Sequence, residues 1–380
     1  MFLARLLVPV LLCVALYWSL RLGYADDLAR RGTPPDLARA IALTPGNARL
    51  FTLTNASLET ASQLNPWNSG TWIQRGLQCE LEGRHKEAER FLLEAARVDH
   101  TFKPLWTLAN FYARAMRPDK LWPYARACLQ IEDRDPVPMF DLCWRVTENA
   151  RLIADAIPLS PAVQAEYLRY LIRTERRQAA AAVYAELPHE SGASGVERAS
   201  LLLDYCDFRL AQSSPDALSP WNATAMDKLY PEGGISLTNG ELHHPPTGRG
   251  FDWRLPVEPG ISANLFRSPS LLRFSLDGDE SEDAGLLWQM LPLLPSRQYR
   301  LKFRYQTSEI PPASGLHWRV GDGKPGADLS SDNWREEVFD FETPPVSRLA
   351  RLALRYHRRA GVMRLKGSLS LAHLRLNLRP

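Results

Sequence analysis

Residues 70–99, GTWIQRGLQCELEGRHKEAERFLLEAARVD, predict two helices joined by a tight turn. Gly83 stands between two amphipathic runs, and glycine ends helices because it adopts left-handed backbone angles at little cost. The small residues Gly76 and Ala88 lie one in each run, after the bulky Trp72. We expect the helices to cross closely where these small residues meet, with Trp72 filling the space beside the crossing.

A weaker copy of this pattern follows. Trp106 comes 34 residues after Trp72, but Asn110 stands where a small residue is expected. Such a period is typical of helical repeats, which need three or more units to bury a continuous core. The segment resembles a tetratricopeptide repeat, with a good match for one unit. The resemblance assigns repeat packing to Trp72, Gly76, Ala88, Leu92, Ala95 and Trp106.

Further helices are expected on both sides of this unit. Upstream, Pro45 and Pro66 each follow a break and open a new helix. Downstream, residues 161–187 carry apolar side chains three or four positions apart, which is the period of an amphipathic helix. We therefore predict a helical-repeat region over residues 26–212.

The hydrophobic period changes after residue 212. Proline and glycine breaks predict a linker over residues 213–235. Beyond it apolar and polar residues alternate, as in Leu272, Phe274 and Leu276, which indicates strands with one buried face. Several short strands between turns predict an antiparallel β-sandwich over residues 236–380. The predicted fold class is thus α + β in separate domains.

The C-terminal part resembles the carbohydrate-binding-module type of jelly roll, the galactose-binding-like fold. The resemblance rests on Thr238-Asn239-Gly240 opening the first strand, Trp253 soon after, and Gln289 ahead of Leu293-Leu294-Pro295. It is more specific for the fold than for a ligand. Taken whole, the chain resembles tetratricopeptide-repeat proteins of bacterial envelopes, including those involved in exopolysaccharide production, and this link rests on domain combination alone.

An uncharged run from Leu6 to Leu20 follows Arg5 at the N-terminus. One cation before an apolar stretch is the layout of a secretory signal or a signal anchor. The run approaches the roughly 20 residues that span a bilayer. We predict an uncleaved transmembrane anchor over residues 1–25, with a signal cleaved before Asp26 or a buried helix as alternatives. The bulk of the protein is then expected on the periplasmic side of the inner membrane.

Charge and cysteine usage narrow the functional classes. A formal net charge of +3 over 380 residues is too small to indicate nucleic acid as a partner. The five cysteines form no CxxC pair and lack zinc-ligand spacing, so we predict no metal site. The four cysteines beyond Cys13 fall on expected helices and are predicted as core residues, with disulfide pairing as the alternative.

We predict no cofactor. The acidic run 277–283 is expected to be a solvated turn, and a structural calcium is the alternative reading because that ion takes several oxygen ligands. The sequence has no GxSxG, HExxH, Walker or Gly-rich dinucleotide motif. We therefore predict that the protein is not an enzyme. A glycan-active enzyme with unrecognised catalytic residues remains the alternative.

Four tryptophans of the C-terminal part are ligand candidates, because indole rings stack on sugar rings. A sandwich core also uses large aromatic side chains. Trp288 and Trp318 are in phase with core leucines and are predicted to be buried. Trp253 and Trp334 stand in loop-like contexts, so they are the predicted glycan-binding rings.

Arg351 and Arg355 are the basic candidates. They alternate with Leu352 and Leu354 and therefore face solvent, where an acidic polysaccharide or water alone would meet them. Taken together, the N-terminal run, the repeats and the sandwich predict a membrane-tethered envelope scaffold. Its repeat groove binds a protein partner, and its sandwich binds glycan or packs on the repeats. A purely structural assembly factor is the remaining alternative.

Overall fold

The computed structural model describes residues 2–53, 58–131, 134–157, 160–187, 195–224 and 227–379, with side chains from Pro9 onward. The chain divides into two compact units, Met1–Pro188 and His189–Pro380. The first is helical, and the second combines a few helices with antiparallel sheets. The predicted order of a helical N-terminal region and C-terminal antiparallel sheets is confirmed.

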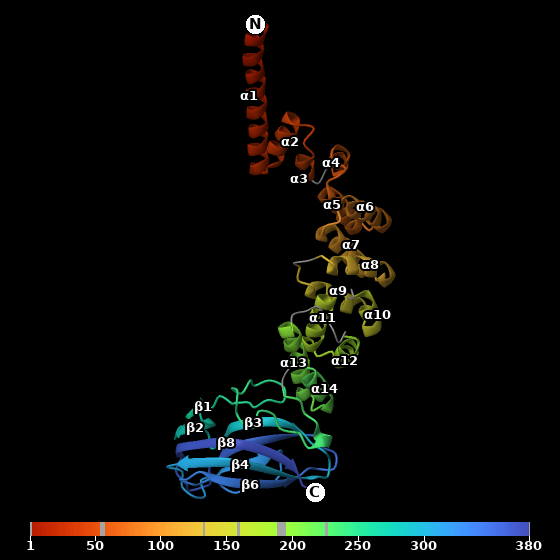
Figure 1. The fold of residues 1–380 in the computed structure, drawn as a ribbon. Coiled ribbons are helices and arrows are strands. Elements are labelled where there is room, and N and C mark those ends of the chain that lie inside the picture. The colour runs from red at the N-terminus through yellow and green to blue at the C-terminus, as the bar shows by residue number, and fades with distance from the viewer. Residues whose placement is uncertain are drawn as a thin grey trace. The chain divides into compact units, whose positions relative to one another are not determined.

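The first unit is built of helices that pair with their neighbours along the chain, most clearly α5 with α6, α7 with α8 and α1 with α2 (Figure 1). Short loops between sequential helices favour such antiparallel pairs. The helices are α1 (Phe2–Arg31), α2 (Pro34–Leu43), α3 (Ala48–Leu53), α4 (Leu58–Leu64), α5 (Ser69–Leu81), α6 (His85–Val98), α7 (Phe102–Arg114), α8 (Pro118–Leu129), α9 (Val137–Val146), α10 (Ala150–Ala156), α11 (Pro161–Arg173) and α12 (Arg177–Glu186).

The α5–α6 pair crosses closely at Gly76. A Cβ added there would lie 2.6 Å from the Leu92 side chain and 3.3 Å from the Ala88 carbonyl oxygen. Ala88, Leu92 and Ala95 are at most 1% exposed. Half-buried Trp72 stacks on Phe91 with ring centroids 6.0 Å apart. A larger side chain at the crossing therefore has no free volume to enter.

The second pair tolerates Asn110 where a small residue was expected. The Asn110 side-chain amide donates to the backbone oxygen of Trp106, at 2.9 Å, so its polar end is satisfied within α7. Trp106 stacks on Phe102, with centroids 5.7 Å apart. This ring contact joins two residues of α7.

We expect Ala88→Leu to lower the free energy of unfolding by about 1–3 kcal/mol, because the added carbons overpack a fully buried crossing. Urea or thermal denaturation measures the change. Ala38→Leu is the matched control, since Ala38 is exposed on α2. A melting temperature of Ala88→Leu equal to that of the wild type would contradict the close crossing.

The N-terminal helix gives the predicted transmembrane anchor no support. In the part of the chain that the structure describes, no helix is long and apolar enough to cross a membrane. The start of the predicted run, up to Val8, lies outside the described side chains. Towards its charged end α1 packs on its neighbours instead, where Ala25 and Leu28 share a small core with Ala40 and Leu50.

The second unit contains α13 (Gly195–Ala211), α14 (Leu218–Asn222) and two antiparallel sheets (Figure 1). The larger sheet has the order β1-β2-β8-β4-β6, and the smaller one has the order β3-β7-β5. Both contribute to one core, which contains Phe274, Phe303 and Trp318. The strands are β1 (Ile261–Arg267), β2 (Ser270–Asp277), β3 (Asp283–Pro292), β4 (Gln298–Ser308), β5 (Leu316–Val320), β6 (Arg335–Glu342), β7 (Leu349–His357) and β8 (Lys366–Leu378).

A bulge in β3 changes which tryptophans are buried. The pairing of β3 with β7 shifts between Gly285 and Leu287, so Leu286 and Leu287 both point into the core. An extra residue in a strand reverses the faces of those that follow. Trp288 therefore lies half-buried on the outer face, and its prediction as a core residue is wrong. Trp318, on a regular strand, is 1% exposed as predicted.

The segment predicted as a linker is folded in its described part. Trp221 of α14 is fully buried in a small core with Cys206 of α13 and Phe251. Its ring nitrogen donates to the Asp227 carbonyl oxygen at 2.8 Å. The prediction of a linker failed because its prolines mark breaks and say nothing about the buried indole. α13 belongs to the second unit, although its sequence was assigned to the repeats.

The carboxylate of Asp207 ties α13 to the segment before the strands. It accepts hydrogen bonds from Arg249 Nε at 2.5 Å, the Gly250 backbone N–H at 2.7 Å and Arg254 Nη2 at 3.0 Å. Burial lowers the pKa of Arg254, and the Asp207 charge opposes that effect. The Asp207 carboxylate thus bridges two guanidinium groups at this junction, and Asp204 of α13 also pairs with Arg249, at 2.7 Å.

The cysteines on helices are core residues, as predicted. Cys79, Cys128, Cys143 and Cys206 are buried, and all are free thiols. Burial raises the pKa of both Cys128 and Cys143 to about 12. Both thiols therefore stay protonated at neutral pH and are poor nucleophiles.

Candidate functional site

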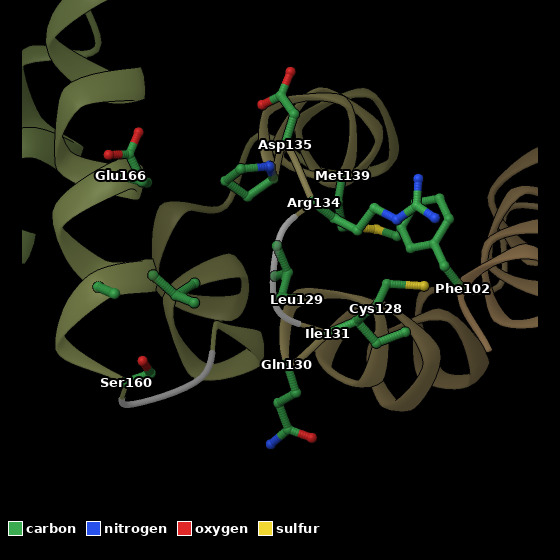
Figure 2. Close-up of a pocket in the computed structure, with 13 residues that line it drawn as sticks. Phe102, Cys128, Leu129, Gln130, Ile131, Arg134, Asp135, Met139, Ser160 and Glu166 are labelled. Atoms are coloured by element: carbon green, nitrogen blue, oxygen red, sulfur yellow. The ribbon is translucent and has the colours of Figure 1, made fainter. Parts of the chain in front are cut away.

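A pocket of about 500 Å³ lies among α8, α9, α11 and the start of α7 (Figure 2). Leu129, Met139 and Val163 contribute apolar surface to its lining. Three charged residues also line it: Arg134, Asp135 and Glu166. Figure 2 shows Glu166, on α11, across the pocket from Arg134 and Asp135. The pocket therefore combines an apolar lining with net negative charge.

Arg134 is held against an aromatic ring. Its guanidinium carbon lies 5.4 Å from the Phe102 ring centroid, which is within the range of a cation–π contact. Asp135 lies just before α9, and its carboxylate accepts from the Val137 backbone N–H at 3.0 Å. The sequence predicted a repeat groove but none of these side chains. They come from separate helices and meet only in the folded chain.

Trp253 is not a surface ring. It is 0% exposed, and its ring lies 6.2 Å from that of Trp318, centroid to centroid. Its ring nitrogen donates to the Asn239 carbonyl oxygen at 3.2 Å. No sugar can reach this indole, so its prediction as a glycan-binding residue is wrong. The loop-like neighbourhood was misleading because the loop itself folds over the core.

The neighbouring Asp252 is a structural carboxylate. It is fully buried and accepts from the backbone N–H and the hydroxyl of Thr247, both at 2.8 Å. It also accepts from the Trp253 backbone N–H at 2.8 Å. Its oxygens hold the loop that carries Trp253, which fits a turn-capping role.

Trp334 lies on an open sheet face. Its side chain precedes β6 and is 38% exposed, as predicted from its context. The Arg304 guanidinium of β4 lies 5.6 Å from its ring centroid. In this face Arg273, Ser370 and Gln306 stand at paired positions across β2, β8 and β4. A row of hydrogen-bonding side chains therefore lies beside an exposed indole.

A second ring lies at the opposite edge of the same sheet. Phe266 of β1 is 42% exposed, and the Arg273 guanidinium lies 5.1 Å from its ring centroid. Arg273 Nε donates to the Ser370 hydroxyl at 3.1 Å, which buries Ser370. Gln306 Nε2 donates to the Asp332 carbonyl oxygen at 2.7 Å. The alternation of polar residues in β2 and β4 was the available sequence signal for this face.

The predicted arginines lie on the other sheet. Arg351 is exposed, and its guanidinium lies 4.2 Å from the Trp288 ring centroid. Arg355 lies on the same face of β7 and forms an ion pair with Asp283 at 2.8 Å. Trp253, Trp334 and these arginines are therefore not brought together in one site.

The acidic run 277–283 is engaged by the protein. Glu280 is 1% exposed and accepts from the backbone N–H groups of Gly278 at 3.0 Å and Leu365 at 2.9 Å. Glu282 pairs with Arg358. Among the described residues, no group of three or more His, Cys, Asp or Glu side chains is placed to hold a metal ion. The calcium alternative gains no support from this arrangement.

No known family model matches the chain. The search of curated proteins also finds no match. Solved structures are similar to its parts. A CBM4 domain matches at 10% identity, with a TM-score of 0.30, over 38% of this chain and all of that one. TmCBM61, solved with β-1,4-galactotriose, matches at 13% identity and a TM-score of 0.24, over 33% of this chain and 88% of its own.

A helical protein is also similar. PilF of Pseudomonas aeruginosa matches at 18% identity and a TM-score of 0.28, over 52% of this chain and 96% of its own. Identities and TM-scores this low assign no ligand or partner to this chain.

Proposed function

We propose that this protein is a non-enzymatic scaffold whose sandwich binds glycan and whose helical unit binds a protein partner. In this proposal the helical unit is a tetratricopeptide-like array and the sandwich is a jelly roll of the carbohydrate-binding-module type. The observation that carries the proposal is the open face of the larger sheet, where Trp334 stands beside Arg304. Hydrolysis of a polysaccharide by the purified protein would overturn the non-enzymatic part.

The chemistry of that face suits a sugar chain. Sugar rings offer CH groups to an aromatic face and hydroxyl groups to hydrogen-bonding side chains, and ligand sites combine apolar surface with a few placed polar groups. The exposed rings of Trp334 and Phe266 come from opposite edges of the sheet, and the polar row lies between them. A chain of several sugars would therefore cross the strands.

The first test is retention of the full-length protein by neutral polysaccharides in affinity electrophoresis. We expect Trp334→Ala to weaken binding about fivefold, because an aromatic contact contributes about 1 kcal/mol. Binding should survive moderate salt, since stacking is not a charge interaction. Trp67→Ala is the control, because Trp67 is an exposed indole of the helical unit, at 71%. Equal retention of wild type and Trp334→Ala would count against this site.

The pocket in the helical unit favours a second binding function. Its apolar lining and the carboxylates of Asp135 and Glu166 fit a partner segment that carries an apolar side chain next to a basic one. Val163→Arg should fill the pocket and abolish capture of that partner in a comparative pull-down. Ala38→Arg, an exposed change on α2, should retain it. Identical protein sets from both variants would refute the pocket as the docking site.

The cellular location is also part of the proposal. We place the protein at the inner membrane, with its bulk on the periplasmic side, on the strength of the apolar run from Leu6 to Leu20 after Arg5. A role in exopolysaccharide production would follow from glycan binding at that location. Cell fractionation tests the location, since a chain that starts at Asp26 should leave the membrane fraction. Recovery of the full-length chain in the cytosol would contradict it.

A further inference from the structure

The outer face of the β3-β7-β5 sheet gathers arginines around one indole. Trp288 comes from β3, where the bulge turns it outward. Arg351 and Arg355 come from β7 and Arg319 from β5, at positions of the same face. Arg254 joins them through a backbone bridge to Trp288. Four guanidinium groups from two strands and a loop therefore lie on the same side of the sheet as Trp288.

Three of these arginines are already engaged. Arg254 bonds to the Gly250 carbonyl oxygen at 2.8 Å and to Asp207 at 3.0 Å. Arg355 pairs with Asp283 at 2.8 Å. Arg319 Nε donates to the Gly323 carbonyl oxygen at 3.1 Å. Their positions are set by the protein itself.

Arg351 differs from its neighbours. Its guanidinium rests on the Trp288 ring, 4.2 Å from the centroid, and Arg254 contacts the same ring at 4.6 Å. Within the described ranges, none of the ion pairs or hydrogen bonds to a carboxylate involves the Arg351 side chain. Partial burial and the charges of Arg355 and Arg254 lower its pKa. An exposed, oriented cation surrounded by like charge attracts an anion.

We propose that Arg351 binds a carboxylate of an acidic polysaccharide, with Trp288 as the ring that orients it. A guanidinium presents forked N–H donors that match the two oxygens of a carboxylate. Arg351 and Arg355 are four residues apart on one strand, about 13 Å. Cations spaced along a strand fit a polymer with repeated charges better than a single small anion. The partly exposed edge of Trp288 beside the cation suits the CH surface of a sugar ring.

This site is distinct from the Trp334 face, because the two lie on different sheets. It widens the proposed glycan binding to uronate-bearing chains and does not depend on Trp334. Trp334→Ala should therefore leave it intact. Loss of neutral glycan binding in one variant and of uronate binding in the other would separate the two proposals.

The probe is polygalacturonate, titrated against the full-length protein by calorimetry. Arg351→Gln should weaken binding at least about tenfold, since it removes a charge-assisted hydrogen-bonded pair. Arg351→Lys should recover only part of the affinity, because lysine keeps the charge and loses the fork. Arg39→Gln is the control, because it removes the same charge from an exposed position of α2. This variant should bind like the wild type.

Salt and a second polyanion complete the test. Raising the salt from 0.15 M to 1 M shortens the Debye length from about 8 Å to about 3 Å, and wild-type binding of polygalacturonate should fall steeply. Equal affinities of wild type and Arg351→Gln would overturn the proposal. So would the absence of binding at millimolar uronate. Polyglutamate bound as tightly as polygalacturonate would show that the face takes acidic protein segments and would overturn the glycan assignment.

Discussion

Trp253→Ala is expected to destabilise the second unit by about 3–5 kcal/mol, the range for truncating a buried aromatic side chain. The ring is 0% exposed and packs beside Trp318. Its removal leaves a cavity and leaves the Asn239 carbonyl oxygen without its indole donor. Urea denaturation followed by tryptophan fluorescence measures the loss. Because the ring cannot contact a glycan, the folded variant should bind glycan like the wild type. Any loss of retention should match the fraction of protein that is unfolded.

Trp334→Ala is the matched control for this experiment. It removes the same side chain from a partly exposed position, 38% against 0%. Surface substitutions of this kind usually change stability by less than about 0.5 kcal/mol. A Trp253→Ala variant as stable as Trp334→Ala would show that the Trp253 ring is not packed in the core.

Asp207→Ala is expected to lower the free energy of unfolding by about 2–4 kcal/mol. The change removes the acceptor of three hydrogen bonds. It leaves Arg254 without its carboxylate partner, whereas Arg249 keeps only Asp204. Breaking a buried ion pair costs about 3–5 kcal/mol, and the expected loss is smaller because Asp207 is 30% exposed. Thermal denaturation together with limited proteolysis of α13 measures it.

Asp340→Ala provides the comparison within the same unit. Asp340 also pairs with two arginines, Arg300 and Arg379, but on the exposed outer side of the larger sheet. Exposed ion pairs contribute about 0–1 kcal/mol, since water solvates the charges that remain. Similar losses for Asp207→Ala and Asp340→Ala would mean that the α13 junction is no more than a surface contact.

The local pattern of the sequence was sufficient for regular elements. The turn at Gly83 and the small residues Gly76 and Ala88 predicted the α5–α6 hairpin, because close helix packing admits few other side chains. The alternation around Phe274 likewise predicted a strand with one buried face, and Leu272 and Leu276 are buried with it. Both inferences use contacts between residues near in sequence.

The candidate sites depended on contacts between distant residues. The two loop-like contexts of Trp253 and Trp334 look alike in sequence, yet one ring is buried and the other exposed. The bulge beside Leu287 reversed the face of Trp288, since a single extra residue shifts the two-residue period. Trp288 thereby came to lie under Arg351.

The sequence by itself determined the order of the helical and strand regions, the close helix crossing at Gly76 and the core role of the cysteines. Only the tertiary structure decided that α13 belongs with the sheets, through Asp207 and Trp221, and that Arg355 pairs with a carboxylate whereas Arg351, among the described residues, does not. The physical reason is the distance along the chain over which each interaction acts. Hydrophobic period and turn preference act over a few residues, whereas burial and charge pairing depend on which distant segments fold against each other.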